Sequence, residues 1–227
     1  MKHASDDPAG GRTVAVGVQA VYDAVARPYD RQFGDELAAK PLDRALLTGF
    51  VELVGRGRIA DVGCGPGHVT RFLATQHPDV IGIDLSPAMI GIARERSPEM
   101  EFTVASMLAL PASDGQWAGV VALYSIIHLD CDERGHACRE FARVIHPGGW
   151  LLVAFHVDSD EFAAGQVNHL TSWFGQRVEL DGYFLDPGGV VAQLEAADFA
   201  LMAKVERRPD AQVEYPSRRC YLLAQRR

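Results

Sequence analysis

The sequence predicts an α/β fold: a single domain built on a seven-stranded, mostly parallel β-sheet, with helices on both faces and an antiparallel C-terminal edge strand. Between residues 57 and 157, short apolar segments alternate with segments of helical periodicity, which is the pattern of a parallel sheet. The apolar segments are hydrophobic throughout, as strands covered by helices on each side require. Residues 187–227 contain one helical and two strand-like segments, an ending that allows antiparallel pairing.

Each element follows from a local pattern. Over residues 41–54, apolar side chains recur at helical spacing, and Pro41 suits a first turn. Ser86 and Pro87 form an N-cap and first position for a helix over residues 86–96. Further helices are predicted at residues 65–75, 132–145 and 187–199. Strands are predicted at residues 57–63, 80–86, 100–106, 119–125, 150–157, 200–208 and 218–226, with an extended segment at 177–185.

The chain divides into a tail and one domain. Residues 1–14 lack an apolar run, so we expect a flexible tail and no signal peptide. Within residues 15–227 we expect N-terminal lid helices at about 15–55, the core sheet at about 58–157, a substrate-lid segment at about 158–186, and a C-terminal helix and strands at about 187–227. In the lid segment, His169, Trp173 and Phe174 are expected on a surface helix.

Composition excludes several kinds of partner. The net charge of −8 argues against nucleic acid and anionic membranes as partners. The four cysteines form no CxxC pair, which favours free thiols and a cytoplasmic location. His136 and Cys138 would point about 200° apart on a helix, so we expect no zinc site, and no other metal site. We expect a small-molecule substrate, no membrane span, and a monomer or homodimer.

A glycine-rich loop follows the first core strand in "DVGCGPG", where Gly63, Gly65 and Gly67 follow Asp61. Such a loop lets the backbone approach a nucleoside closely. A dinucleotide-binding loop has the pattern G-x-G-x-x-G, but His68 stands where its third glycine or alanine belongs. Asp84 ends the second strand, where a carboxylate can accept both ribose hydroxyls. The alternative role for Asp84 is a charge at a helix N-terminus.

Five motifs in order, "DVGCGPG", "GIDLSPAMIGIAR", "ASMLALP", "IIHL" and "HPGGWLLVAFH", resemble those of the class I S-adenosylmethionine-dependent methyltransferases. The resemblance is closest to the small bacterial enzymes that methylate metabolites and natural products, and it extends from Tyr22 to Arg226. It implies a Rossmann-like fold, S-adenosylmethionine as the cofactor and S-adenosylhomocysteine as its product.

The resemblance also implies roles for individual residues. Asp61, Gly63 and Gly65 would face the amino-acid end of the cofactor, and Asp84 its ribose. The adenine would lie among Leu85, Met89, Ser106 and Met107, and the methionine part beside Tyr124 and Ser125. An N-terminal helix carrying Tyr22 and Tyr29 would close over the cofactor. The sequence departs from the family where Ser106 and Ala118 replace residues that are often acidic.

Three side chains are candidates for catalysis. His128 follows the fourth strand, at the sheet edge where α/β proteins bind ligands, and an unperturbed histidine pKa of about 6.5 suits a general base. The alternative for His128 is a buried residue that bonds to the backbone. His156 ends the fifth strand at the same edge, and Tyr183 could reach the substrate from the late extended segment. Methyl transfer itself is an in-line displacement that depends mainly on positioning.

The aromatic residues of the lid segments suit a small, flat or apolar acceptor, with oxygen, nitrogen or carbon as the nucleophile. A nicotinamide-dependent oxidoreductase is a competing hypothesis, against which His68 and Asp61 argue. Two further hypotheses are a protein with the cofactor fold that only binds or regulates, and an enzyme that keeps the cofactor but catalyses a non-methylating rearrangement.

Overall fold

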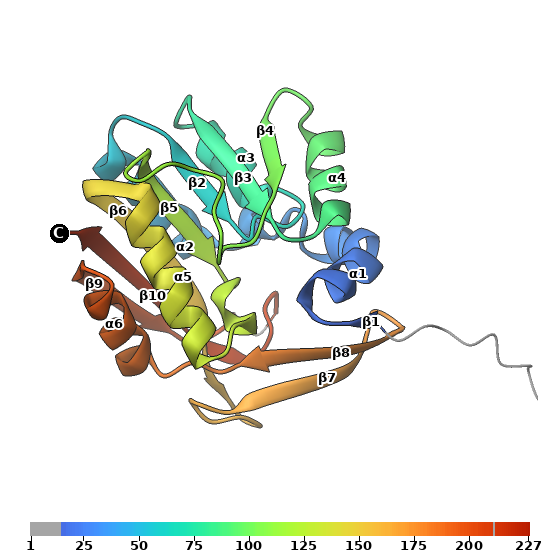
Figure 1. Cartoon of the computed structure of the whole chain (residues 1–227). Coiled ribbons are helices and arrows are strands. Elements are labelled where there is room, and N and C mark those ends of the chain that lie inside the picture. The colour runs from blue at the N-terminus through green and yellow to red at the C-terminus, as the bar shows by residue number, and fades with distance from the viewer. Residues whose placement is uncertain (1–14, 211) are drawn as a thin grey trace, which may run out of the picture.

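The computed structural model describes residues 15–210 and 212–227, so the tail predicted over residues 1–14 lies outside the described residues. At its centre is a seven-stranded sheet with the strand order β4-β3-β2-β5-β6-β10-β9 (Figure 1). The predicted α/β fold with a mostly parallel sheet is confirmed. Its strands are β2 (Ile59–Val62), β3 (Val80–Asp84), β4 (Glu101–Val104), β5 (Trp117–Leu123), β6 (Ile145–Ser159), β9 (Phe199–Arg207) and β10 (Ser217–Arg226).

One strand of this sheet, β10, runs opposite to the other six. The five strands from β4 to β6 run parallel to one another. β10 pairs antiparallel with both β6 and β9, so the antiparallel C-terminal pairing is confirmed. β10 lies sixth in the order, and β9 takes the edge.

The apolar strands supply two cores, one on each face of the sheet. In β5, Val120 and Ala122 enter the core beneath the helices α5 (Cys131–Val144) and α6 (Pro187–Ala196). Val121 enters the core beneath α2 (Pro41–Val54) and α3 (His68–Ala74). Because successive side chains of a strand point to opposite faces, a strand buried on both sides must be apolar at every position. This explains the uninterrupted hydrophobic runs in the sequence.

The helices begin where local signals predict. Ser86 accepts a hydrogen bond from the Met89 backbone amide at 3.1 Å, and Pro87 is the first residue of its helix. Asp130 and Glu133 form a reciprocal capping box. The α-helices are α1 (Val18–Phe33), α2 (Pro41–Val54), α3 (His68–Ala74), α4 (Pro87–Arg96), α5 (Cys131–Val144) and α6 (Pro187–Ala196); short 3₁₀ helices are η1 (Glu36–Ala39) and η2 (Ile126–His128). No described helix has the length and apolar character of a membrane span.

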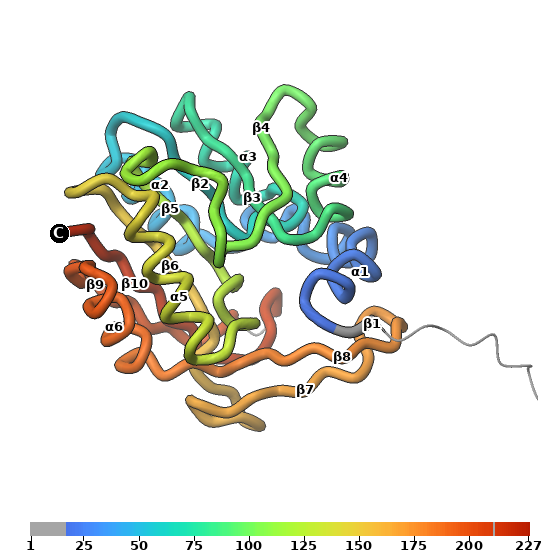
Figure 2. The backbone as a smooth tube through the Cα atoms, in the orientation of Figure 1, coloured from blue at the N-terminus to red at the C-terminus, as the bar shows by residue number. Residues whose placement is uncertain are grey.

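A second, three-stranded sheet lies beside α1, in the order β1-β8-β7 (Figure 2). It consists of β1 (Ala15–Val16), β7 (Val167–Trp173) and β8 (Gln176–Tyr183). The prediction of a surface helix at His169, Trp173 and Phe174 is therefore wrong, because this segment forms two strands. Phe174 and Gly175 both have positive φ values, 49° and 73°, and form the two-residue turn of a β-hairpin. The turn joins β7 and β8 as an antiparallel pair. We call this pair of strands the hairpin cap.

Candidate active site

Two adjacent cavities open at the carboxyl ends of the parallel strands. The larger cavity has a volume of about 610 Å³ and the smaller one about 300 Å³. Both values lie within or at the edge of the range of small-molecule sites, roughly 300–1,000 Å³. Five residues line both cavities: Tyr22, Tyr29, Glu36, Tyr124 and His128. Ligands in the two cavities would therefore meet at this shared wall.

The glycine loop forms one side of the larger cavity. Gly63 has a φ of 79°, and a Cβ atom there would lie 2.2 Å from the Cβ of Ser125. Ser125 is itself fixed, because its hydroxyl donates to the Val62 carbonyl at 2.9 Å. The loop amide of Gly65 then donates to Asp84 Oδ2 at 2.8 Å. The absence of a side chain at position 63 thus lets β2, β5 and the loop converge on one point.

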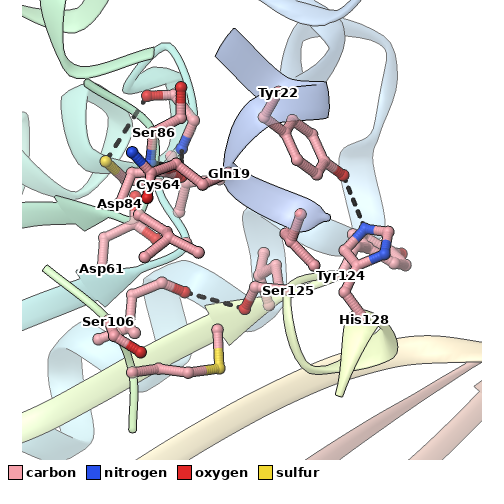
Figure 3. A pocket seen from close by; sticks show the side chains of 18 of the residues that line it. Gln19, Tyr22, Asp61, Cys64, Asp84, Ser86, Ser106, Tyr124, Ser125 and His128 are labelled. Atoms are coloured by element: carbon pink, nitrogen blue, oxygen red, sulfur yellow. Dashed lines mark hydrogen bonds between the residues drawn. The ribbon is translucent and has the colours of Figure 1, made fainter. Parts of the chain in front are cut away.

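Asp84 ends β3 and points into the larger cavity (Figure 3). Its Oδ1 accepts the Ser86 amide at 2.8 Å, while Oδ2 accepts the Gly65 amide. Each carboxylate oxygen can accept a further bond, so two ribose hydroxyls would still find acceptors. Burial raises the pKa of Asp84, although its backbone hydrogen bonds oppose that rise.

Asp61 is 2% exposed and lines the same cavity. Burial raises its pKa to about 6, and the hydrogen bond from the Thr70 hydroxyl, at 2.6 Å, limits the rise. A cationic group beside Asp61 would favour its ionised form. Further acids line the larger cavity: Asp23, Glu36, Asp43 and Glu133. The electrostatic field there suits a ligand that carries positive charge, as the sulfonium and ammonium of S-adenosylmethionine do.

Eleven of the twelve residues predicted to bind the cofactor line the larger cavity: Tyr22, Tyr29, Asp61, Gly63, Gly65, Asp84, Leu85, Ser106, Met107, Tyr124 and Ser125. The twelfth residue, Met89, does not line this cavity, which corrects its predicted place beside the adenine. Its side chain is fully buried against Ala26 and Ile92, between α1 and α4, because it occupies the face of α4 that packs on α1. The departure at Ala118 lies in the amino-terminal half of β5, away from both cavities.

One residue that attaches α1 to the cavity is not evident from the sequence. Asp23 Oδ1 accepts hydrogen bonds from the Ser86 hydroxyl at 2.5 Å and from the Ala88 amide at 3.0 Å. These bonds join α1 to the first turn of α4, across 63 and 65 residues of sequence. An acid in the middle of an amphipathic helix gives no local signal of such a contact.

The smaller cavity lies between α1 and the hairpin cap, and eight of its twenty lining residues are aromatic. The Trp173 ring meets the rings of Tyr22 and Tyr29 at centroid distances of 5.5 and 5.7 Å. At the tip of the hairpin cap, Phe174 packs on Phe33 at 6.2 Å. Other aromatic residues of the wall are Tyr124, Tyr183, Phe184 and Tyr215. A flat or apolar molecule would be well matched to these surfaces.

His128 belongs to the shared wall, and both of its nitrogens are engaged. Figure 3 shows the bond to Tyr22. Nδ1 lies 2.8 Å from the Asp181 carbonyl oxygen, and Nε2 lies 2.7 Å from the Tyr22 hydroxyl. A carbonyl only accepts, so Nδ1 carries the proton, and Nε2 of the neutral ring accepts from Tyr22. Burial lowers the pKa of His128, which favours that neutral form.

The remaining two catalytic candidates are placed differently. His156 lines only the smaller cavity, and its Nδ1 lies 2.6 Å from the Ser217 hydroxyl. Burial, followed by the charges of Arg219 and Lys40, lowers the pKa of His156 to about 3. Tyr183 also lines only the smaller cavity, with its ring 5.7 Å from the Arg134 guanidinium. Of the three candidates, His128 alone touches both cavities.

Tyr124 has a φ of 55°, a conformation that non-glycine residues adopt rarely. Its hydroxyl lies 2.8 Å from the hydroxyl of Tyr221, which in turn donates to Asp43 Oδ1 at 2.8 Å. Asp43 forms an ion pair with Arg207 at 3.0 Å. The strained backbone is held by this chain of buried polar groups, as strain at functional sites commonly is. Among residues 15–210 and 212–227, no group of three or more potential metal ligands is found.

Comparisons with known proteins agree with this geometry. Residues 59–149 match a family described as a methyltransferase domain. Trans-aconitate 2-methyltransferase of Methylobacterium nodulans is 33% identical over 127 residues, covering 54% of this chain and 46% of that protein. Demethylmenaquinone methyltransferase of Renibacterium salmoninarum is 31% identical over 139 residues, covering 60% and 57%. The chain thus spans about half the length of these relatives.

The solved structure of the cyclase SpnF has the same fold, with a TM-score of 0.70 and 21% sequence identity; the match covers 95% of this chain and 98% of that one. The chain is thus similar to methyltransferases over residues 59–149, and it shares its fold with the cyclase SpnF.

Proposed function

We propose that this protein holds S-adenosylmethionine in the larger cavity and transfers its methyl group to a small aromatic or apolar acceptor in the smaller cavity. The observation that carries the proposal is the shared wall of Tyr22, Tyr29, Glu36, Tyr124 and His128. Two ligands that meet there are held side by side, which is what a direct displacement needs.

The residues of the larger cavity fit the cofactor. Asp84 would accept the ribose hydroxyls through the lone pairs that its two backbone amide bonds leave free. Asp61 would face the ammonium group of the methionine part, and Ser106 and Met107 would flank the adenine. The cofactor, when bound, supplies a methyl group on a sulfonium, which is already a good leaving group. The protein therefore acts mainly by orientation, which can supply about 7–11 kcal/mol.

Tyr22 and His128 would handle the proton of the nucleophile. Tyr22 accepts that proton on its oxygen while its own proton moves along the 2.7 Å hydrogen bond to His128 Nε2. The bond from the nucleophile to the methyl carbon forms as the carbon–sulfur bond breaks, and His128 later releases the proton to solvent. Such proton transfer contributes about 10²–10⁴-fold to the rate.

The acceptor is proposed from the walls of the smaller cavity. The rings of Tyr29, Trp173 and Phe33 present broad apolar surface, and His156 and Lys40 add polar atoms. The relatives named above bear the names of different acceptors, so similarity to them alone does not choose one.

The test is to incubate the protein with S-adenosylmethionine and a panel of aromatic hydroxyl and amine compounds. We expect S-adenosylhomocysteine and a methylated product to form in equal amounts. Conversion of an acceptor without release of S-adenosylhomocysteine would instead indicate a non-methylating reaction. Binding of cofactor with no conversion of any compound would favour a protein that binds without catalysis.

A further inference from the structure

Three tyrosines stand in the shared wall, and for two of them, Tyr22 and Tyr124, hydrogen bonds determine where the hydroxyl proton points. Tyr22 and Tyr124 line both cavities, on α1 and after β5 respectively. A hydroxyl has one proton to donate and lone pairs that accept. If its proton is held by another protein group, only its lone pairs remain for a ligand.

The proton of Tyr124 is held by a buried chain. Tyr221, 2% exposed, donates its only proton to Asp43 Oδ1 at 2.8 Å. The Asp43 carboxylate is 1% exposed and forms an ion pair with Arg207 at 3.0 Å, and a carboxylate oxygen only accepts hydrogen bonds. Since Tyr221 has no second proton, Tyr124 must be the donor in the 2.8 Å bond between the two hydroxyls. Tyr124 therefore offers lone pairs alone to the cavities.

The proton of Tyr22 is held in the same way. His128 Nδ1 must donate to the Asp181 carbonyl at 2.8 Å, so its Nε2 accepts the Tyr22 proton at 2.7 Å. Burial raises the pKa of both Tyr22 and Tyr124, so both hydroxyls remain protonated and both protons stay committed. The two hydrogen bonds involve different parts of the chain. Both leave a tyrosine hydroxyl of the shared wall with only its lone pairs to offer a ligand.

The two cations of the smaller cavity are paired with two carboxylates of the same cavity, Lys40 with Glu36 at 2.8 Å and Arg219 with Glu214 at 3.5 Å. Arg219 donates through its two Nη atoms to the carbonyls of Ser217 and Tyr215, and its unpartnered Nε is buried. Near the shared wall, an anionic acceptor would meet the lone pairs of Tyr22 and Tyr124, and the charges of both cations are already balanced by Glu36 and Glu214.

We propose that the shared wall selects a nucleophile that brings its own hydrogen, a hydroxyl or an amine, and rejects a carboxylate. The hydroxyl or amine donates to Tyr124 or Tyr22, which turns a lone pair of the nucleophile toward the methyl group. A carboxylate would set its lone pairs against those of both tyrosines. This inference rests on the proposed function, and it names the acceptor class of that site.

Three probes of one shape test the inference: 2-naphthol, 2-naphthylamine and 2-naphthoate. Each is titrated by calorimetry into protein saturated with S-adenosylhomocysteine, whose own binding is measured first. We expect 2-naphthol and 2-naphthylamine to bind at least about tenfold more tightly than 2-naphthoate, the factor for roughly one hydrogen bond.

Variants locate the cause of the preference. Tyr221→Phe removes the acceptor of the Tyr124 proton, which can then turn into the cavity; we expect the preference for 2-naphthol over 2-naphthoate to shrink about tenfold. Tyr124→Phe removes the lone pairs, so 2-naphthol should weaken while 2-naphthoate does not. Tyr215→Phe is the matched control, because Tyr215 lines the smaller cavity and its hydroxyl bonds to no described residue. It should leave the preference unchanged. Melting temperatures show whether each variant is folded.

The outcomes separate the two proposals. Failure to bind S-adenosylhomocysteine would count against the proposed function itself. Normal S-adenosylhomocysteine binding would leave that function standing. In that case the inference is overturned if 2-naphthoate binds as tightly as 2-naphthol, if none of the three probes binds, or if folded Tyr221→Phe and Tyr124→Phe proteins both keep the wild-type preference.

Discussion

The larger and smaller cavities meet at one wall but are built in different ways. The larger cavity is formed by short loops that directly follow β2, β3, β4 and β5, with acids at the ends of two of these strands. The smaller cavity is closed by the hairpin cap and by side chains far apart in sequence that line it alone, such as Phe33, His156 and Arg219. Cofactor recognition thus depends on local motifs, whereas acceptor recognition depends on long-range packing. Substitutions on the two sides should therefore have separable effects.

The largest expected effect is on turnover alone. His128→Ala should lower the rate of methyl transfer by about 10²–10⁴-fold, because it removes the group that takes up the proton. The affinity for S-adenosylhomocysteine should stay within a few fold. The control is His146→Ala, since His146 is exposed and lines neither cavity. Turnover within about twofold of wild type would show that His128 is not the base and that its role is structural, through its hydrogen bond to the backbone.

A second substitution tests the convergence of the glycine loop. Gly63→Ala should lower the free energy of unfolding by about 2–5 kcal/mol, from the left-handed backbone and the clash with Ser125 together. Gly148→Ala is matched in backbone, with a φ of 81°, but has nothing within 4 Å of its Cβ position. It should cost only the backbone part, about 1–2 kcal/mol. If denaturant unfolding gives the same loss of stability for Gly63→Ala and Gly148→Ala, the contact with Ser125 at position 63 adds no cost.

Asp84 and Asp79 offer a matched pair across one strand, because Asp84 ends β3 and Asp79 directly precedes it. Asp84→Ala should weaken S-adenosylhomocysteine binding by about 1.5–3 kcal/mol, the range for a hydrogen bond to a charged group. Asp79→Ala removes the same charge at the opposite edge of the sheet and should leave the affinity unchanged. If calorimetry finds the same S-adenosylhomocysteine affinity for both variants, Asp84 does not bind the ribose.

The smallest effect is a pH dependence confined to the larger cavity. The pKa of Asp61 is raised to about 6 by burial. Under the proposed function, its ionised form would attract the ammonium of the cofactor. Protonation of Asp61 should therefore weaken S-adenosylhomocysteine binding as the pH falls through 6, by roughly tenfold at pH 5 relative to pH 7. Asp61→Asn should bind more weakly at pH 7 and give a flatter profile. A wild-type affinity that is constant from pH 7 to pH 5 would contradict this role.

The same contrast explains what can be predicted from the sequence. Ser86, Pro87 and the glycine loop act within a few residues, so their roles follow from spacing, and the structure places them as predicted. Asp84 belongs to this class, since the end of a buried strand fixes its position. The prediction for Met89 is wrong because spacing along α4 does not reveal which of its faces packs on α1.

The acceptor side cannot be predicted in the same way. The pattern around Trp173 suggests a helix, but the fold of this segment depends on the Phe174–Gly175 turn, in which a phenylalanine takes a left-handed conformation that the sequence does not favour. The chain from Tyr124 through Tyr221 to Asp43 joins residues that are 97 and 178 positions apart. Only the sheet order, which places β10 beside β6, brings them together.

The most direct test of the central claim is a calorimetric titration of the protein with S-adenosylhomocysteine, with NADH as the control ligand. The geometry of Asp61, Asp84 and the glycine loop predicts micromolar binding of S-adenosylhomocysteine and none of NADH. Binding of NADH, or of neither ligand, would contradict the assignment of the larger cavity to S-adenosylmethionine.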